Sequence, residues 1–63
     1  MAFKILVVDD EEIIRDSISY ILDSEGYEVD KAENGKIAYE KIKEKHFDLV
    51  ITDIEMPAMK GTE

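Results

Sequence analysis

The chain has 63 residues, enough for one small domain, and its 16 acidic and 8 basic residues give a formal net charge of −8. This charge repels phosphate backbones and anionic lipid, so we expect no nucleic-acid or membrane partner for the segment. The absence of cysteine and the single histidine exclude disulfides and a zinc site of Cys and His ligands, and the lack of any long apolar run favours a cytoplasmic location.

The first predicted element is a strand at residues 3–8, where an apolar run is interrupted only by Lys4. Such a run is typical of a strand that is covered on both faces of a sheet. Residues 12–25 then carry apolar side chains at helical spacing, which predicts an amphipathic helix ended by Gly26. The apolar stripe of this helix consists of Ile14, Ile18, Ile21 and Leu22.

The next elements continue the alternation of strand and helix. Residues 27–32 alternate apolar and charged side chains, which predicts a strand at a sheet edge. Asn34 is the expected N-cap of a second helix, and residues 47–51 form the third predicted strand. The second helix has an apolar stripe of Ile37, Ala38, Tyr39 and Ile42.

This element order predicts an α/β fold with a three-stranded parallel sheet (βαβαβ), because crossover helices join parallel strands. No linker, repeat or low-complexity tract divides residues 1–63, so we expect a single domain or half domain.

Two acidic clusters follow the first and third predicted strands. Asp9 and Asp10 end the first, and Asp53 and Glu55 follow the third. Because the carboxyl ends of parallel strands meet at one edge of a sheet, we expect Asp9, Asp10 and Asp53 to converge. At a separation of about 5 Å each pair of carboxylates costs roughly 3 kcal/mol, so the site needs a proton or a divalent cation.

An all-oxygen site of this kind suits Mg²⁺ (or Mn²⁺) and leaves one carboxylate free to attack phosphorus. The alternative interpretation of Asp9 and Asp10 is a pair of acids that favour the positive end of a helix dipole.

With its surroundings, the acidic pattern resembles the receiver domain of two-component response regulators. The resemblance is carried by residues 7–11, 25–27, 32–35 and 48–61, the last of which include Met56-Pro57 and Gly61. It implies a flavodoxin-like doubly wound fold. It also implies a phosphoprotein of phosphorelay signal transduction that is not itself an enzyme.

The resemblance also implies a role for each acidic residue. Asp53 is the phosphoacceptor, which takes a phosphoryl group from a histidine kinase or a histidine phosphotransfer protein. Asp10 is the direct Mg²⁺ ligand, Asp9 acts largely through water, and Glu55 contributes its backbone carbonyl.

A complete receiver domain has five strands and five helices, so the resemblance implies a truncated N-terminal half at residues 1–63. The later strands would carry a hydroxyl residue and a lysine that contact the phosphoryl oxygens, so we expect impaired phosphotransfer and switching. The alternative is an isolated or engineered half receiver that acts only as a self-assembling structural module.

The family's strand order implies that the first strand lies between the second and the third. The third strand carries no charge between Asp48 and Asp53, so its edge should recruit a partner, and Leu6, Val8 and Val50 should be partly bare on a monomer. We therefore expect a homodimer with antiparallel third strands, or a higher homo-oligomer.

Two further groups are interpreted as surface. The lysines at residues 41–45, balanced by Glu40 and Glu44, predict a solvated helix face, and His46 predicts a solvent-facing loop.

Overall fold

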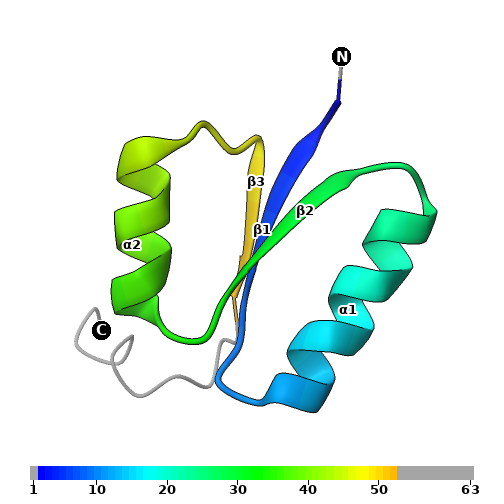
Figure 1. Cartoon of the computed structure of the whole chain (residues 1–63), viewed down its shortest axis with the longest axis horizontal. Coiled ribbons are helices and arrows are strands. Elements are labelled where there is room, and N and C mark those ends of the chain that lie inside the picture. The colour runs from blue at the N-terminus through cyan, green and yellow to red at the C-terminus, as the bar shows by residue number, and fades with distance from the viewer. Residues whose placement is uncertain (1, 53–63) are drawn as a thin grey trace, which may run out of the picture.

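The computed structural model describes residues 2–52, and the structural statements below concern these residues. Strands and helices alternate in the predicted order (Figure 1). The elements are β1 (Lys4–Val8), α1 (Glu12–Ser24), β2 (Glu28–Ala32), α2 (Gly35–Glu44) and β3 (Leu49–Thr52).

The sheet has the strand order β2-β1-β3, and both strand pairs are parallel. The predicted arrangement, with β1 in the middle and β2 and β3 at the edges, is therefore confirmed. The two helices lie on opposite sides of this sheet (Figure 1), as right-handed crossovers require when the step from β1 to β2 and the step from β2 to β3 run in opposite directions across the sheet. Each face of β1 is thus covered by one helix.

The C-terminus of α1 is formed by a Schellman motif around Gly26. The N–H of Tyr27 donates to the carbonyl of Leu22 at 3.3 Å, and the N–H of Gly26 donates to the carbonyl of Asp23 at 3.0 Å. Gly26 has a φ of 98°, a conformation in which a Cβ atom is disfavoured. The predicted helix end is confirmed, and it turns the chain directly into β2.

The N-terminus of α2 is capped as predicted. The Asn34 side chain accepts a hydrogen bond from the N–H of Ile37 at 2.9 Å. This satisfies one of the donors that a helix leaves unpaired in its first turn.

The core is built around β1, whose last four residues are all buried. Leu6 and Val8 pack with Ala32 and Ala38 on the face covered by α2. The prediction that Leu6 and Val8 would be partly bare is therefore wrong. Ile37 and Phe47 also pack against this cluster, so one helix and the segment before β3 are enough to cover the face of a central strand.

The apolar surface that stays open includes β3, one flank of α1, and Tyr39 and Ile42 of the predicted stripe of α2. Val50 is 40% exposed, as predicted, and Leu49 is 46% exposed. In α1 only Ile18 and Leu22 of the predicted stripe are half-buried, whereas Ile14 and Ile21 are exposed. The apolar stripe of α1 is wider than the area that packs on the sheet, because the described sheet has only three strands.

In the described part of the chain, no helix has the length and apolar character needed to cross a membrane.

Candidate functional site

The ends of β1 and β3 lie side by side. Their parallel register pairs Val8 with Thr52, the residues that directly precede Asp9 and Asp53 in the sequence. The pairing is the condition under which two acidic clusters that follow these strands can share a site. Asp53, Glu55, Met56-Pro57 and Gly61 lie outside the described residues.

Asp9 is buried, with 7% of its surface exposed, and three hydrogen bonds fix it. Its N–H donates to the carbonyl of Ala32 at 3.2 Å. Its Oδ1 accepts from the N–H of Glu11 at 2.8 Å, and its carbonyl accepts from Nη1 of Arg15 at 2.9 Å. The backbone and one carboxylate oxygen of Asp9 are therefore committed to the turn between β1 and α1.

Asp10 has the opposite environment. It is exposed, and its side chain makes no hydrogen bond or ion pair with any described residue. Both residues precede α1, whose N-cap residue Glu11 provides no side-chain cap. The unpaired N–H groups at this end favour nearby carboxylates, which contributes roughly 0.3–1 kcal/mol for an exposed acid.

Two of the four predicted metal ligands, Asp9 and Asp10, thus lie in the described structure. The described residues alone contain no group of three or more His, Cys, Asp or Glu side chains able to hold a metal ion. The donors that are described are carboxylate oxygens on one short turn, which fit a hard divalent cation better than zinc.

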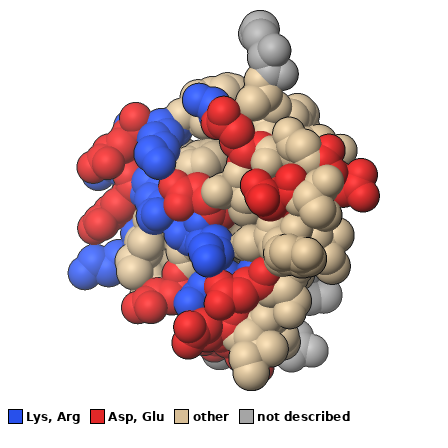
Figure 2. Space-filling view, turned by 45° about the vertical axis from the view of Figure 1, so that its right-hand side comes forward, with Lys and Arg blue, Asp and Glu red and all other residues tan. Residues whose placement is uncertain are grey.

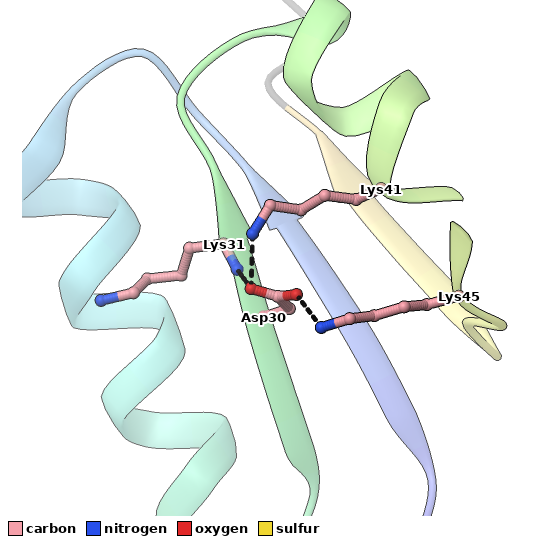
Figure 3. Close-up of polar contacts among 4 residues, drawn as sticks. All are labelled: Asp30, Lys31, Lys41 and Lys45. Atoms are coloured by element: carbon pink, nitrogen blue, oxygen red, sulfur yellow. Dashed lines mark hydrogen bonds and ion pairs between the residues drawn. The ribbon is translucent and has the colours of Figure 1, made fainter. Parts of the chain in front are cut away.

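A second polar cluster is centred on Asp30 of β2 (Figure 3). Lys41 Nζ donates to its Oδ1 at 2.9 Å, and Lys45 Nζ donates to its Oδ2 at 3.0 Å. On the other face of the sheet, Lys31 forms an ion pair with Asp16 of α1 at 3.0 Å. Adjacent residues of β2 therefore tie the edge strand to both helices.

Lys41 is half-buried in this cluster, whereas Lys43 and Lys45 are exposed, so the solvated helix face predicted at residues 41–45 is confirmed except at Lys41. Figure 2 shows lysine and arginine side chains gathered in a band with acidic side chains on both sides of it. Lys43 differs from its neighbours, since its Nζ lies 5.1 Å from the centre of the Tyr39 ring.

The lysines change the acidity of Asp30. Burial by itself raises the pKa of this carboxyl group, but the hydrogen bonds from Lys41, Lys45 and the backbone of Lys31 outweigh it and lower the pKa from 3.8 to about 2. The lowered value makes the cluster a source of stability that depends on pH.

We predict that Asp30→Asn lowers the free energy of unfolding at pH 6 by about 1 kcal/mol, after allowance for solvent screening of this partly exposed group. Because the folded pKa lies below the ordinary value, the contribution is complete above pH 3.8 and is lost as the pH falls toward 2. Urea unfolding at pH 6 and pH 3 measures it, with Asp23→Asn as the matched control. Equal losses of stability in the parent and in Asp30→Asn over this range would contradict the prediction.

At the opposite end of the sheet, Asp48 joins the starts of β1 and β3. Its Oδ2 accepts from the N–H of Lys4 at 2.8 Å, and His46 Nε2 lies 3.1 Å from its Oδ1. The hydrogen bond from Lys4, and then the one from His46, lower the pKa of Asp48. His46 is solvent-facing, as predicted, but it has an acidic partner.

An open groove of about 460 Å³ lies at this end of the sheet, lined by Lys4, Lys45, His46 and Phe47 among others. Asp9 and Asp10 are not among its lining residues.

Reading the sequence missed the Asp30 cluster and the contact of Arg15. Alternation along residues 27–32 does place Asp30 and Lys31 on opposite faces of β2, and this was a usable signal. No sequence pattern indicated that the Arg15 side chain reaches back to the carbonyl of Asp9.

Comparisons with known proteins give a consistent result. The family model for the response regulator receiver domain matches residues 5–63. The chemotaxis protein CheY of Bacillus subtilis is 52% identical over 62 residues, which cover 97% of this chain and 52% of CheY. The uncharacterized transcriptional regulatory protein YesN of the same organism is 47% identical over 64 residues, covering 97% of this chain and 17% of YesN.

The fold agrees with a solved structure of the chemotaxis protein CheY4 of Vibrio cholerae. The TM-score is 0.87 at 41% sequence identity, and the match covers 97% of this chain and 51% of CheY4. The chain thus spans about half, or less, of the length of these relatives. The three strands and two helices match the N-terminal part of a flavodoxin-like fold, as predicted.

Proposed function

The chain belongs to the response regulator receiver domain family, and from this we propose that it is a phosphoacceptor module of two-component signal transduction, modified at Asp53. The observation that carries the proposal is the pairing of Val8 with Thr52, which sets side by side the two strand ends that Asp9, Asp10 and Asp53 follow. We take residues 1–63 as one receiver unit that is shorter than the complete domain.

We propose Asp9, Asp10, Asp53 and the backbone carbonyl of Glu55 as the ligands of Mg²⁺ or Mn²⁺. A bound divalent cation would offset the repulsion between carboxylate and phosphoryl oxygens. Exposed Asp10, with no partner among the described residues, is available for direct ligation. Asp9, with Oδ1 held by the turn, is better suited to act through a water molecule.

The reaction needs a phosphorylated histidine on a histidine kinase or a histidine phosphotransfer protein. A carboxylate oxygen of Asp53 attacks the phosphorus atom and forms an acyl phosphate. The bond from phosphorus to the imidazole nitrogen breaks, and that nitrogen leaves with the electron pair. The module receives a group and turns over no other substrate, so we do not class it as an enzyme.

The 63-residue chain is further proposed to associate with itself as a homodimer or higher homo-oligomer. Exposed Leu49 and Val50 on the edge strand β3 support this. The resemblance supports a cytoplasmic location, and the net charge of −8 disfavours a nucleic-acid or membrane partner for this segment.

Incubation with a small acyl phosphate and Mg²⁺, followed by intact-mass and peptide mass spectrometry, tests the phosphoacceptor. We expect slow addition of one phosphoryl group to Asp53. The rate should be low because a preorganised cationic donor such as the family's later lysine accounts for about 100-fold or more in rate, and the 63 residues do not include that later part of the domain.

Asp53→Asn should abolish the modification, and Asp23→Asn, the same chemical change on α1, should leave it intact. Modification that survives Asp53→Asn would assign the chemistry to another residue. Complete failure to modify the folded parent chain would overturn the proposed function of these 63 residues.

A further inference from the structure

Arg15 is the single arginine of the chain and lies in the second turn of α1. It is half-buried, unlike most charged residues of this helix, and its Nη1 donates to the carbonyl of Asp9 at 2.9 Å. Asp9 lies six residues before Arg15 in the sequence, so the side chain of Arg15 extends back over the turn that carries Asp9 and Asp10. Arg15 therefore ties the start of α1 to the end of β1.

The carbonyl that Arg15 contacts belongs to a residue whose N–H and Oδ1 are also hydrogen-bonded. The N–H of Asp9 is bonded to β2 and its Oδ1 to the N–H of Glu11, while the N–H of Arg15 donates to the carbonyl of Glu11 at 2.9 Å. Backbone and side chain of Arg15 thus close both sides of the same turn. If the guanidinium were removed, the carbonyl of Asp9, which belongs to a buried residue, would lose this hydrogen-bond donor.

We propose that Arg15 is a positioning residue of the acidic site: it fixes the turn so that the carboxylates of Asp9 and Asp10 are preorganised for a divalent cation. The inference rests on the proposed function, because it concerns the same cation. Arg15 is not a ligand itself, since a guanidinium has no free electron pair to donate.

Two effects of Arg15 on cation binding oppose each other. Its positive charge disfavours a second cation nearby, by a few-fold for partly screened charges. Its hydrogen bond orients the ligands, and loss of such supporting contacts typically lowers metal affinity by about 10- to 100-fold. We therefore expect the loss of positioning to outweigh the loss of charge when Arg15 is replaced. Weaker cation binding indicates the positioning effect, and tighter binding indicates the charge effect.

The test measures the dissociation constant of Mn²⁺ for the 63-residue chain by electron paramagnetic resonance, and of Mg²⁺ by competition. Arg15→Met should weaken binding by about tenfold. Arg15→Lys keeps the charge and one donor, so it should restore affinity to within about threefold of the parent. Lys43→Met is the control for charge, since it also removes one cation but lies in the last turn of α2, at the far end of the sheet (Figure 1).

Tighter binding by Arg15→Met would show that Arg15 acts through charge alone and would overturn the inference. Unchanged affinity in a folded Arg15→Met sample would do the same, even if the melting temperature fell.

A second readout does not depend on the cation. Without metal, amide exchange at Asp9 and Glu11 should become about tenfold faster in Arg15→Met, while exchange at Ile37 in α2 stays as in the parent. If the parent binds no cation but this local change is seen, the metal site fails and the positioning role of Arg15 in the turn stands. If the local change is absent, the inference fails irrespective of cation binding.

Discussion

Val50→Lys should unfold the 63-residue chain rather than release a stable monomer. Val50 lies opposite Leu6 on the face covered by α2, and among the described residues β3 pairs only with β1. A core this small rarely supplies more than about 3–5 kcal/mol, so the folded state should depend on burial at the open edge. A lysine at the centre of β3 both opposes antiparallel pairing with a second copy and places a charge beside the core.

Sedimentation equilibrium and circular dichroism over a range of concentrations measure this effect. The parent should be at least a dimer, with a melting temperature that rises with concentration. Ile13→Lys is the matched control, because Ile13 is 80% exposed on α1 and should tolerate the charge. A well-folded parent monomer at high micromolar concentration would rule out the association, and a folded Val50→Lys monomer would rule out its coupling to stability.

Asp10→Asn should remove the stabilisation of the chain by Mg²⁺. At about ten times its dissociation constant, a ligand that binds only the folded state contributes about 1.4 kcal/mol, which corresponds to roughly 5–10 °C in a domain of this size. Loss of one carboxylate removes both a direct ligand and the charge repulsion that the cation relieves. Neutralisation should therefore raise the melting temperature without Mg²⁺ and abolish the further rise on its addition.

Thermal melts with and without excess Mg²⁺ provide the measurement, and Asp23→Asn serves as the control for the removal of one acidic charge. The control should keep the full shift, since Asp23 lies in the last turn of α1, away from the acidic turn. A parent melting curve that does not respond to Mg²⁺ would refute the metal site, and a shift that persists in Asp10→Asn would assign the ligand role elsewhere.

Local signals in the sequence predicted most of the element boundaries to within two residues. The run at residues 3–8 became β1, Asn34 became an N-cap, and Gly26 became the residue that ends α1. Each of these depends on neighbours along the chain: a capping oxygen, a positive φ, or a continuous apolar run. Parallel pairing and strand order followed from the alternation of elements and from the family resemblance.

Burial was predicted less well, because it depends on what packs across the sheet. Leu6 and Val8 of β1 are buried, whereas Ile14 and Ile21, which belong to the regular apolar stripe of α1, are exposed. A helical stripe records which side chains are apolar, but the width of the sheet beneath the helix decides how many of them are buried.

Residues close together along the chain are enough to predict the alternating βαβαβ order, the family, and the placement of acidic residues after the first and third strands. The hydrogen bonds of Asp30 with Lys41 and Lys45, and the contact of Arg15 with the carbonyl of Asp9, became visible only in the folded chain. The direction in which a long charged side chain extends depends on a partner that the crossovers bring near, and not on its own neighbours in sequence.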